Sequence, residues 1–333
     1  MWRCLRLLLL ISISATPLLA QSSSVAVIGG EESTGAELGN FVKVLALQDH
    51  IIVLERDAPF IRVFDVNGQP RQSLGRLGSG PGEYRAPTWL TWDSSTRRVL
   101  VVDASNARVT SYALGDTLAS PRFLTLENVG IRRVCRVGES LYGFDRIAPQ
   151  LVRELIIRED RLVSVRTFGD RVTRHPLGKH RLVLSRVNDG PLHCDERTGT
   201  VFVGSRMLGE IQEIELRSGR QTTTPIEGFK GPVLSIVDEG TALRQQVPEA
   251  GMDMLDNILG GPDGPLVIVG KWRRQEGSSP APVAYEIARL RNGLAMDRRT
   301  GSSMPVGYTR RGVVCARMDP VPTILLPSGR SCD

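Results

Sequence analysis

One stretch of the sequence, residues 75–87, has the glycine content of a phosphate-binding loop. Its members include Gly75, Gly78, Gly80, Pro81, Gly82, Glu83 and Tyr84. A phosphate cradle needs free backbone N–H groups and, in the P-loop, a lysine followed by serine or threonine. No such pair follows here, and Pro81 removes one backbone donor. We therefore predict a tight crossing between two β units, in which Glu83 and Tyr84 fix the start of the next strand. A contact with a ligand at the rim is the alternative.

A second group, His193, Cys194 and Asp195, places a base, a nucleophile and a carboxylate next to one another. Consecutive residues of a strand point to opposite faces, so His193 and Cys194 cannot meet if this segment is a strand. Cys194 is therefore expected in a disulfide rather than as a catalytic thiol. No two of the four histidines have the helical spacing of zinc ligands.

A third group consists of Asp253, Asp256 and Asn257, whose oxygen atoms suit a hard cation such as calcium. Such a site would need matching acids or amides from other strands, and the sequence shows none at equivalent positions. No Gly-x-Ser-x-Gly elbow and no spaced pair of catalytic carboxylates is present either. The sequence therefore predicts no catalytic residue and no cofactor, with calcium as the alternative cofactor.

The elements around these residues follow a repeating pattern of short strands and tight turns. Residues 42–47, 51–54 and 60–64 form the first unit, and residues 89–92, 98–102 and 107–112 form the second. Further copies align at residues 134–144, 192–204, 259–269 and 315–326. The separation of the first two units, about 46 residues, is typical of four-stranded propeller blades.

Six copies predict an all-β fold, a six-bladed β-propeller with about four antiparallel strands in each blade. Each copy alone has two apolar faces and exposed edges, and a radial arrangement buries face against face. The last copy runs out of chain after two clear strands. The spare strand at residues 24–28 could close the ring as an outer strand of that blade. One strand of the sixth blade then remains unassigned.

Two connections are long, a basic one at residues 172–187 and one at residues 227–251. The second is expected to contain a short helix at residues 237–247. Long connections of this kind lie on one rim of a propeller, where specificity is usually carried.

Residues 101–112 contain Asp103, Asn106 and Arg108 in the order hydrophobic-Asp, two residues, Asn, one residue, Arg, then a β-branched and an aromatic residue. With the glycine-rich loop before it, this segment resembles exported bacterial six-bladed propellers related to NHL-repeat and TolB-like domains. The residue types fit local roles: Asp103 can bond the turn backbone and Asn106 tolerates a left-handed conformation. Val109 and Tyr112 are expected to face neighbouring blades.

Residues 1–20 resemble a secretory leader, with Arg3 and Arg6 before an apolar run too short to span a bilayer. We therefore expect one propeller domain at residues 21–333, exported to the periplasm or beyond, with no transmembrane segment. The net charge of +6 includes no run of five basic residues, which argues against nucleic acid as a partner.

Four cysteines remain after the leader: Cys135, Cys194, Cys315 and Cys332. Four cysteines allow three pairings, and an oxidising compartment favours two disulfides. The repeat alignment places Cys135, Cys194 and Cys315 near the same position of blades three, four and six. Because blades three and four are adjacent, Cys135–Cys194 is plausible, which leaves Cys315 to join the tail at Cys332.

The sequence therefore favours a non-enzymatic binding or scaffolding propeller of the cell envelope or secretome. Its ligand, a protein, peptide or glycan, would lie at the channel mouth or the loop rim. The alternative is a channel-site enzyme, either a lyase or a calcium-dependent hydrolase of the type found among propeller lactonases. The sequence does not indicate an oligomeric state.

Overall fold

The computed structural model describes residues 26–29, 37–173, 175–177, 180–237, 242–261, 263–274, 280–291, 294–317 and 322–326. The predicted leader and Cys332 lie outside these residues.

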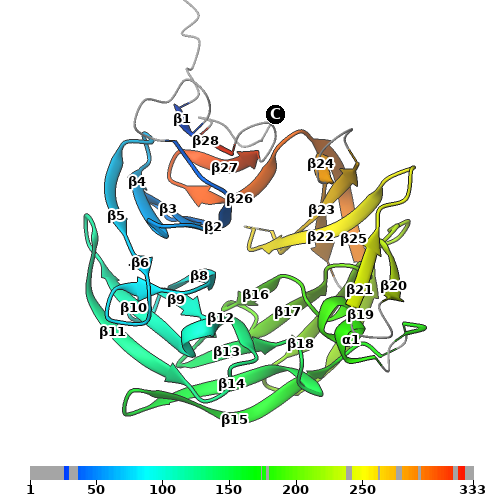
Figure 1. Cartoon of the computed structure of the whole chain (residues 1–333), viewed down its shortest axis with the longest axis horizontal. Coiled ribbons are helices and arrows are strands. Elements are labelled where there is room, and N and C mark those ends of the chain that lie inside the picture. The colour runs from blue at the N-terminus through cyan, green and yellow to red at the C-terminus, as the bar shows by residue number, and fades with distance from the viewer. Residues whose placement is uncertain are drawn as a thin grey trace, which may run out of the picture.

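The protein is an all-β, six-bladed propeller, as the repeats predict (Figure 1). In each blade the chain starts at the strand nearest the centre of the ring and moves outward. Blades 2 and 3 also share a short parallel pairing between their outer strands. Blade 1 has β2 (Phe41–Ala46), β3 (His50–Glu55), β4 (Ile61–Asp65) and β5 (Pro70–Leu74). Blade 2 has β8 (Pro87–Asp93), β9 (Arg98–Asp103), β10 (Arg108–Leu114) and β11 (Leu118–Leu126). Blade 3 has β12 (Ile131–Val137), β13 (Ser140–Asp145), β14 (Gln150–Arg158) and β15 (Arg161–Asp170). Blade 4 has β16 (Leu192–Asp195), β17 (Thr200–Ser205), β18 (Glu210–Glu215) and β19 (Gln221–Pro225). Blade 5 has β22 (Met252–Leu259), β23 (Leu266–Arg273), β24 (Ala281–Arg291) and β25 (Leu294–Gly301). Blade 6 has β26 (Met304–Thr309), β27 (Gly312–Arg317), β28 (Thr323–Leu326) and β1 (Ala26–Gly29).

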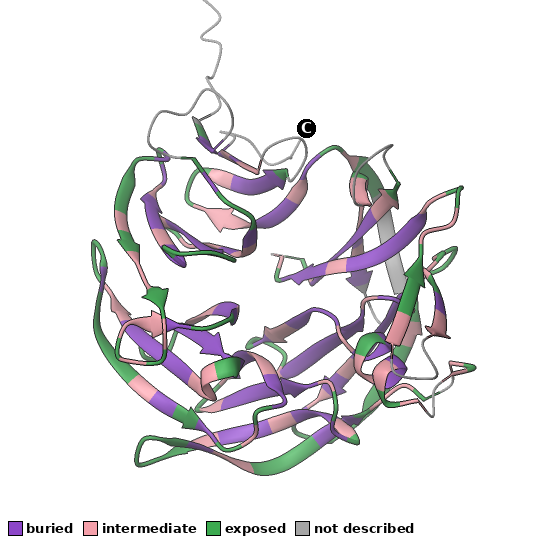
Figure 2. Cartoon of the chain, in the orientation of Figure 1, coloured by how far each residue is buried: buried purple, intermediate pink, exposed green. Residues whose placement is uncertain are grey.

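The second strand of a blade is apolar on both faces because both faces are covered. In β9, Val99 and Val101 pack in the cluster between blades 1 and 2, whereas Leu100 and Val102 pack between blades 2 and 3. Side chains alternate along a strand, so a continuous apolar run serves two interfaces. Figure 2 shows the consequence: burial follows the inner and middle strands, and exposure follows the outer ones.

The N-terminal strand closes the ring, as predicted. β1 pairs antiparallel with β28, from Ala26↔Leu326 to Gly29↔Thr323, and forms the outer strand of blade 6. Ile28 is fully buried and packs with Phe64 of blade 1 and Ile324 of blade 6. The two ends of the described chain therefore hold the first and last blades together.

The predicted register of the sixth copy is wrong by one strand. Cys315 lies on β27, the second strand of blade 6, and residues 323–326 form its third strand, β28. The unassigned inner strand is β26, which contains Pro305 and Gly307. Proline and glycine are rare within strands, so the sequence gives no strand pattern here. Pro305 is tolerated because β26 is the inner edge strand of its blade and has a bulge at this point, where a missing N–H breaks no necessary hydrogen bond.

Both long connections lie on one face, which we call the loop face. Four alternating strands return the chain to the face on which the blade began, so every link between blades is made there. The first link contains α1 (Arg181–Val187), and the second contains the hairpin of β20 (Val233–Val237) and β21 (Ala242–Gln246). The predicted helix at residues 237–247 is therefore wrong. Residues 242–246 form β21 instead, and the β-branched apolar run of residues 233–237 suits its partner strand β20.

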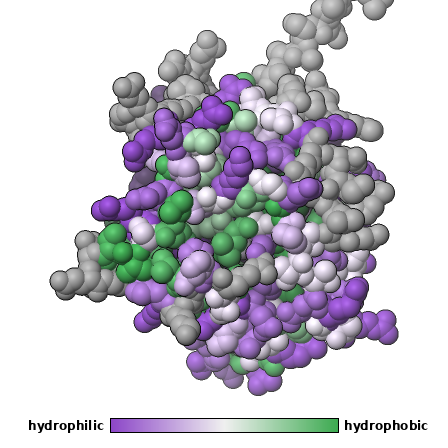
Figure 3. All heavy atoms as spheres, turned by 90° about the vertical axis from the view of Figure 1, so that its right-hand side faces the viewer, coloured by the Kyte–Doolittle hydropathy of each residue, from purple (hydrophilic) through white to green (hydrophobic). Residues whose placement is uncertain are grey.

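These two connections pack on each other beside blades 4 and 5. Val183 and Val187 of α1 share an apolar cluster with Leu234 of β20 and with Met207 and Met252. Figure 3 views this side of the molecule, where apolar residues lie among hydrophilic ones at the surface. Among the described residues, no helix is long and apolar enough to cross a membrane.

Candidate functional site

The glycine-rich loop satisfies its own polar groups. Within it, β6 (Arg76–Leu77) and β7 (Glu83–Tyr84) pair in parallel. The Glu83 carboxylate accepts from the Gly80 N–H at 2.7 Å and forms an ion pair with Arg76 at 2.8 Å. Gly78 has a φ of 151°, which L side chains rarely adopt, and a Cβ atom there would also lie 2.2 Å from this carboxylate, so the position favours glycine.

The NHL-like motif holds this loop from the neighbouring strands. Asp103 is fully buried and accepts from the N–H groups of Arg85 at 3.0 Å and Ala86 at 3.3 Å. Asn106 donates to the Gly78 carbonyl at 3.0 Å, and Arg108 donates to those of Ser79, Gly80 and Glu83. The loop and the motif form one structural unit between blades 1 and 2. These contacts support the structural role over a ligand-binding one.

One detail of the predicted motif is wrong. Asn106 ends the short 3₁₀ turn η1 (Ala104–Asn106), and the left-handed residue is Ala107, with φ 49° and ψ 45°. Asp103 holds the turn by accepting from the Asn106 backbone N–H at 3.3 Å and from its side chain at 2.8 Å. The Asn106 side chain is thus used for hydrogen bonding, which leaves the next residue to reverse the chain. Val109 and Tyr112 face opposite neighbours, blade 3 and blade 1.

His193, Cys194 and Asp195 have three separate partners. Cys194 forms a disulfide with Cys135, which joins the inner strands of blades 3 and 4 with a Cα–Cα distance of 5.7 Å. His193 stacks on Phe202, and burial lowers the pKa of His193 to about 4. Asp195 accepts from the backbone N–H of Arg197 at 3.0 Å. The three therefore do not form a catalytic set.

Cys315 does not share the position of the other two cysteines. It is buried on a second strand, whereas Cys135 and Cys194 lie on inner strands. Cys315 is disulfide-bonded, and its predicted partner Cys332 lies outside the described residues. The pairing with Cys332 stays a prediction.

The three candidate calcium ligands do not converge either. Asp253 pairs with Lys271 at 3.1 Å, and Asp256 pairs with Arg206 at 2.8 Å. Asn257 accepts from Lys43 at 3.2 Å. Across the described part of the chain, no group of three histidine, cysteine or acidic side chains has the geometry to hold a metal ion.

A different group of polar residues does converge, at the loop-face end of the inner strands. Bulges in the ladders of β2, β8, β12 and β22 precede Lys43, Trp89, Arg133 and Asn257 at equivalent places. Lys43 Nζ lies 4.3 Å from the centroid of the Trp89 ring, and Arg133 Cζ lies 5.5 Å from it. A bulge re-aims the side chain that follows it, and here it brings residues of four blades together.

Ion pairs extend this group around the loop face. Arg133 and Arg146 both pair with Asp189, at 2.7 Å and 3.4 Å. Asp189 lies at the start of blade 4, and the nearby Arg206 pairs with Asp256 of blade 5. We call the whole set the mouth cluster, and its members are Lys43, Trp89, Arg133, Arg146, Asp189, Arg206, Asp256 and Asn257. Superposing the repeats shows a long or polar residue at Lys43, Trp89 and Arg133, which is the signal that sequence reasoning missed.

Burial and charge shift the titration of this cluster. Burial, and then the charge of Arg133, lowers the pKa of Lys43 to about 7. Burial alone would raise the pKa of Asp189, but Arg133 and Arg146 outweigh it and hold that pKa below the ordinary value. Burial raises the pKa of Asp256 despite its pair with Arg206. The cluster is thus a partly desolvated site with strong internal fields.

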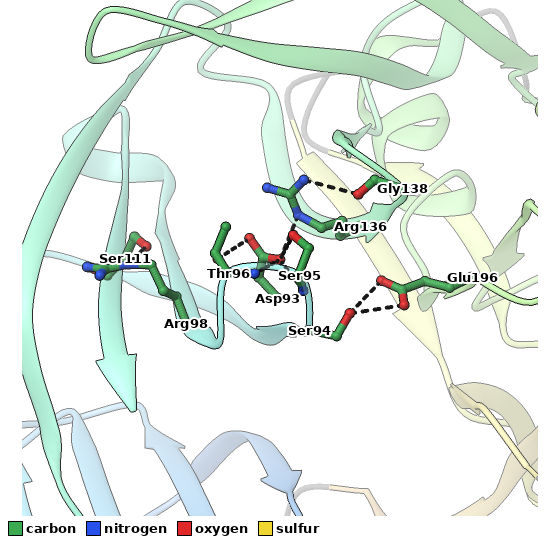
Figure 4. Close-up of polar contacts among 9 residues, drawn as sticks. All are labelled: Asp93, Ser94, Ser95, Thr96, Arg98, Ser111, Arg136, Gly138 and Glu196. Carbon is green, nitrogen blue, oxygen red and sulfur yellow. Dashed lines mark hydrogen bonds and ion pairs between the residues drawn. The ribbon is translucent and has the colours of Figure 1, made fainter. Parts of the chain in front are cut away.

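The face opposite the loop face has a groove instead of a polar cluster. A groove of about 360 Å³ lies between blades 4 and 5 and is lined by Asp195, Arg197, Phe202, Glu213 and Asp263, among others. Nearby, Ser94 of blade 2 donates to Glu196 of blade 4 at 2.9 Å (Figure 4). The turns of blades 2 and 4 therefore meet on this face.

These features define the class, a six-bladed β-propeller with a polar cluster at one end of its inner strands. The model of the family DUF5128, described as a 6-bladed beta-propeller, matches residues 21–161. No curated protein matches the sequence. The closer resemblance to NHL-repeat and TolB-like propellers stays a prediction.

Solved structures show the same fold at low sequence identity. A member of the DUF4221 family from Bacteroides vulgatus is 7% identical with a TM-score of 0.58, and the alignment covers 90% of this chain and 95% of that one. A Bacteroides thetaiotaomicron protein of unknown function is 11% identical with a TM-score of 0.56, over 90% and 74% of the two chains. Virginiamycin B lyase from Staphylococcus aureus is 11% identical over 86% and 94%, but its TM-score of 0.48 carries no argument about activity.

Proposed function

We propose that the protein is an exported, non-enzymatic binding module whose ligand is bound at the mouth cluster on the loop face. The observation that carries this proposal is the convergence of polar side chains from blades 1, 2, 3 and 5 and from the start of blade 4. The long connections rise on the same face, and such loops are where propellers carry specificity. The predicted leader and the Cys135–Cys194 disulfide support an oxidising compartment.

The chemistry of the cluster favours binding over calcium-dependent catalysis. A calcium site needs several oxygen ligands directed at one point. Both carboxylate oxygens of Asp189 are taken, one by Arg133 and one by Arg146. Those of Asp256 are taken by Arg206 and Trp272. What this cluster presents to a ligand is therefore chiefly nitrogen donors.

The test uses the purified mature chain, immobilised and exposed to envelope and secreted fractions of its native host. Bound material is identified by mass spectrometry for the wild type, Lys43→Met, Arg146→Met and the control Arg310→Met. Arg310 is 59% exposed in its side chain and lies on the opposite face. We expect the wild type and Arg310→Met to retain the same ligand and both mouth variants to lose it.

Equal retention by all four proteins would overturn the proposal, provided that their thermal unfolding shows them folded. Turnover of ester or lactone substrates that requires added calcium and is lost in Asp256→Asn would favour the enzyme alternative instead.

A further inference from the structure

An excess of positive charge surrounds a single carboxylate at the loop face. The positive charges of Arg133, Arg146 and Arg206 act on the Asp189 carboxylate. The charges of Arg132 and Arg186 in turn repel that of Arg146. We call these residues the arginine cluster: Arg132, Arg133, Arg146, Arg186 and Arg206. Within the described part of the chain, the only carboxylates paired with it are those of Asp189 and Asp256. Five guanidinium groups against two carboxylates leave a net positive charge.

The arginines keep hydrogen-bond donors available. In the contacts of the described residues, Arg133, Arg146 and Arg206 each use one terminal nitrogen for an ion pair. A guanidinium group carries five N–H donors in a planar fork. The side chains of these three are 18%, 22% and 39% exposed, so outer nitrogens remain within reach of a ligand.

Concentrating like charges in this way is unfavourable without a counter-charge. Burial and the repulsion from Arg132, Arg186 and Arg133 together lower the pKa of Arg146, although Asp189 opposes them. The two aspartates supply one negative charge each, and their oxygens already accept from Arg133, Arg146, Arg206 and Trp272. An external anion would relieve this repulsion and would meet guanidinium donors suited to carboxylates and phosphates.

We propose that the mouth cluster and the arginine cluster bind a ligand through an oxyanion group, a carboxylate or a phosphate, with Arg146 and Lys43 as direct donors. This inference rests on the proposed function and names the chemical class of its ligand. A cationic ligand would meet the excess positive charge, and a neutral one would leave that charge uncompensated.

Lys43 gives the binding a predictable pH dependence. The groups that face it are Arg133 from β12, His193 from β16, Asn257 from β22 and Trp89 from β8; β26 has no charged residue. His193, with its pKa lowered to about 4, stays neutral between pH 6 and 8. An anion beside Lys43 would raise the lysine pKa from about 7, so binding takes up a proton and tightens as pH falls from 8 to 6.

The experiment titrates the mature chain by calorimetry with inorganic phosphate and with citrate, against sodium chloride at equal ionic strength. Affinities are expressed per concentration of the fully ionised ligand, because phosphate and citrate themselves take up protons between pH 8 and pH 6. On that basis we expect one of the two oxyanions to bind, and to bind more tightly at pH 6 than at pH 8. Binding of phosphate indicates a phosphate ligand, and binding of citrate indicates a carboxylate ligand. Arg146→Met should weaken binding about tenfold, since it removes a charge-assisted contact. Arg186→Met should weaken it about two- to threefold by removing a charge without breaking an ion pair of the described residues. The opposite-face variant Arg310→Met should match the wild type.

The inference fails if neither oxyanion binds beyond the chloride control, or if Arg146→Met binds as the wild type does. It also fails if the ligand captured at the mouth is neutral or cationic, and in that case the proposed function stands. If every mouth variant still captures the ligand, the proposed function itself is wrong.

Discussion

Asp93 of blade 2 and Arg136 of blade 3 form an ion pair with an Oδ1–Nε distance of 2.7 Å and side chains only 3% and 7% exposed (Figure 4). Each residue lies near the end of an inner strand, on the face opposite the mouth cluster. Asp93 also accepts from the hydroxyl groups of Ser95 and Thr96, at 2.8 Å and 2.7 Å. The carboxylate therefore closes its own turn with both oxygens and binds the next blade through Oδ1.

Breaking this pair should be strongly destabilising. Arg136→Met would leave the Asp93 carboxylate buried without its cation, and removal of one partner of a buried pair typically costs about 3–5 kcal/mol. Asp93→Asn would keep a turn acceptor but leave the arginine charge buried. Urea unfolding of both single variants and of the double variant measures the coupling. We expect the double variant to recover much of the loss, and additive losses would show that the pair contributes nothing of its own.

The Cys135–Cys194 disulfide should stabilise the blade 3–blade 4 interface. It closes a loop with a sequence separation of 59 residues. Disulfides typically contribute about 2–4 kcal/mol, and the loop-entropy relation gives about 4 kcal/mol for a loop of this size. The double variant Cys135→Ala/Cys194→Ala should therefore unfold at lower urea concentration than the wild type. An unchanged midpoint would contradict this contribution.

Asp103 should matter for stability and not for ligand binding. Replacing it by alanine removes the carboxylate that accepts from the part-buried N–H groups of Arg85 and Ala86, and hydrogen bonds to a charged group contribute about 1.5–3 kcal/mol. The exposed Asp116→Ala on another turn of blade 2 is the matched control and should change stability little. Calorimetric binding by the folded Asp103→Ala protein should equal that of the wild type. Weaker binding by this variant would indicate that the glycine-rich loop contacts the ligand.

Ring closure can be tested within the closing strand itself. Ile28→Ala removes a fully buried side chain from the blade 6–blade 1 core and should cost about 2–5 kcal/mol. The adjacent Val27 is 44% exposed on the other face of β1, so Val27→Ala should cost less than about 0.5 kcal/mol. Thermal unfolding of both variants compares them directly. Equal effects would mean that β1 is not docked as described.

Lys43 should make stability depend on pH above neutrality. As pH falls from about 10.5 to about 7, the unfolded chain gains a proton at Lys43 that the folded protein does not bind. The free energy of unfolding therefore decreases across this window and receives no further change from Lys43 below it. Lys43→Met should lack this part of the slope in urea unfolding between pH 7 and 10. NMR titration of the ¹³C-methylated chain, which has four lysines, should show one midpoint near pH 7. Identical slopes for wild type and variant would contradict the shift.

Local patterns in the sequence were sufficient for most of the fold. Alternating and continuous apolar runs predict strands such as β9 because the period of a strand is a property of a few neighbouring residues. The sequence also predicts the closing strand β1, because its apolar run has no other place in the repeats. Pro305 and Gly307 interrupt the apolar run of β26, so the sequence pattern does not predict this strand and places Cys315 one strand too early in the blade.

The sequence by itself determined the repeat, the blades and the inability of Cys194 to act with its neighbour His193, since each follows from chemistry within about fifty residues. Only the tertiary structure decided that the glycine-rich loop and Asp103 form one unit, and that Lys43, Arg133 and Asn257 lie in one site. Lys43 and Asn257 are 214 residues apart and meet only because the ring closes. No local pattern encodes that contact: it depends on the bulges that re-aim these side chains and on the packing of blades against one another.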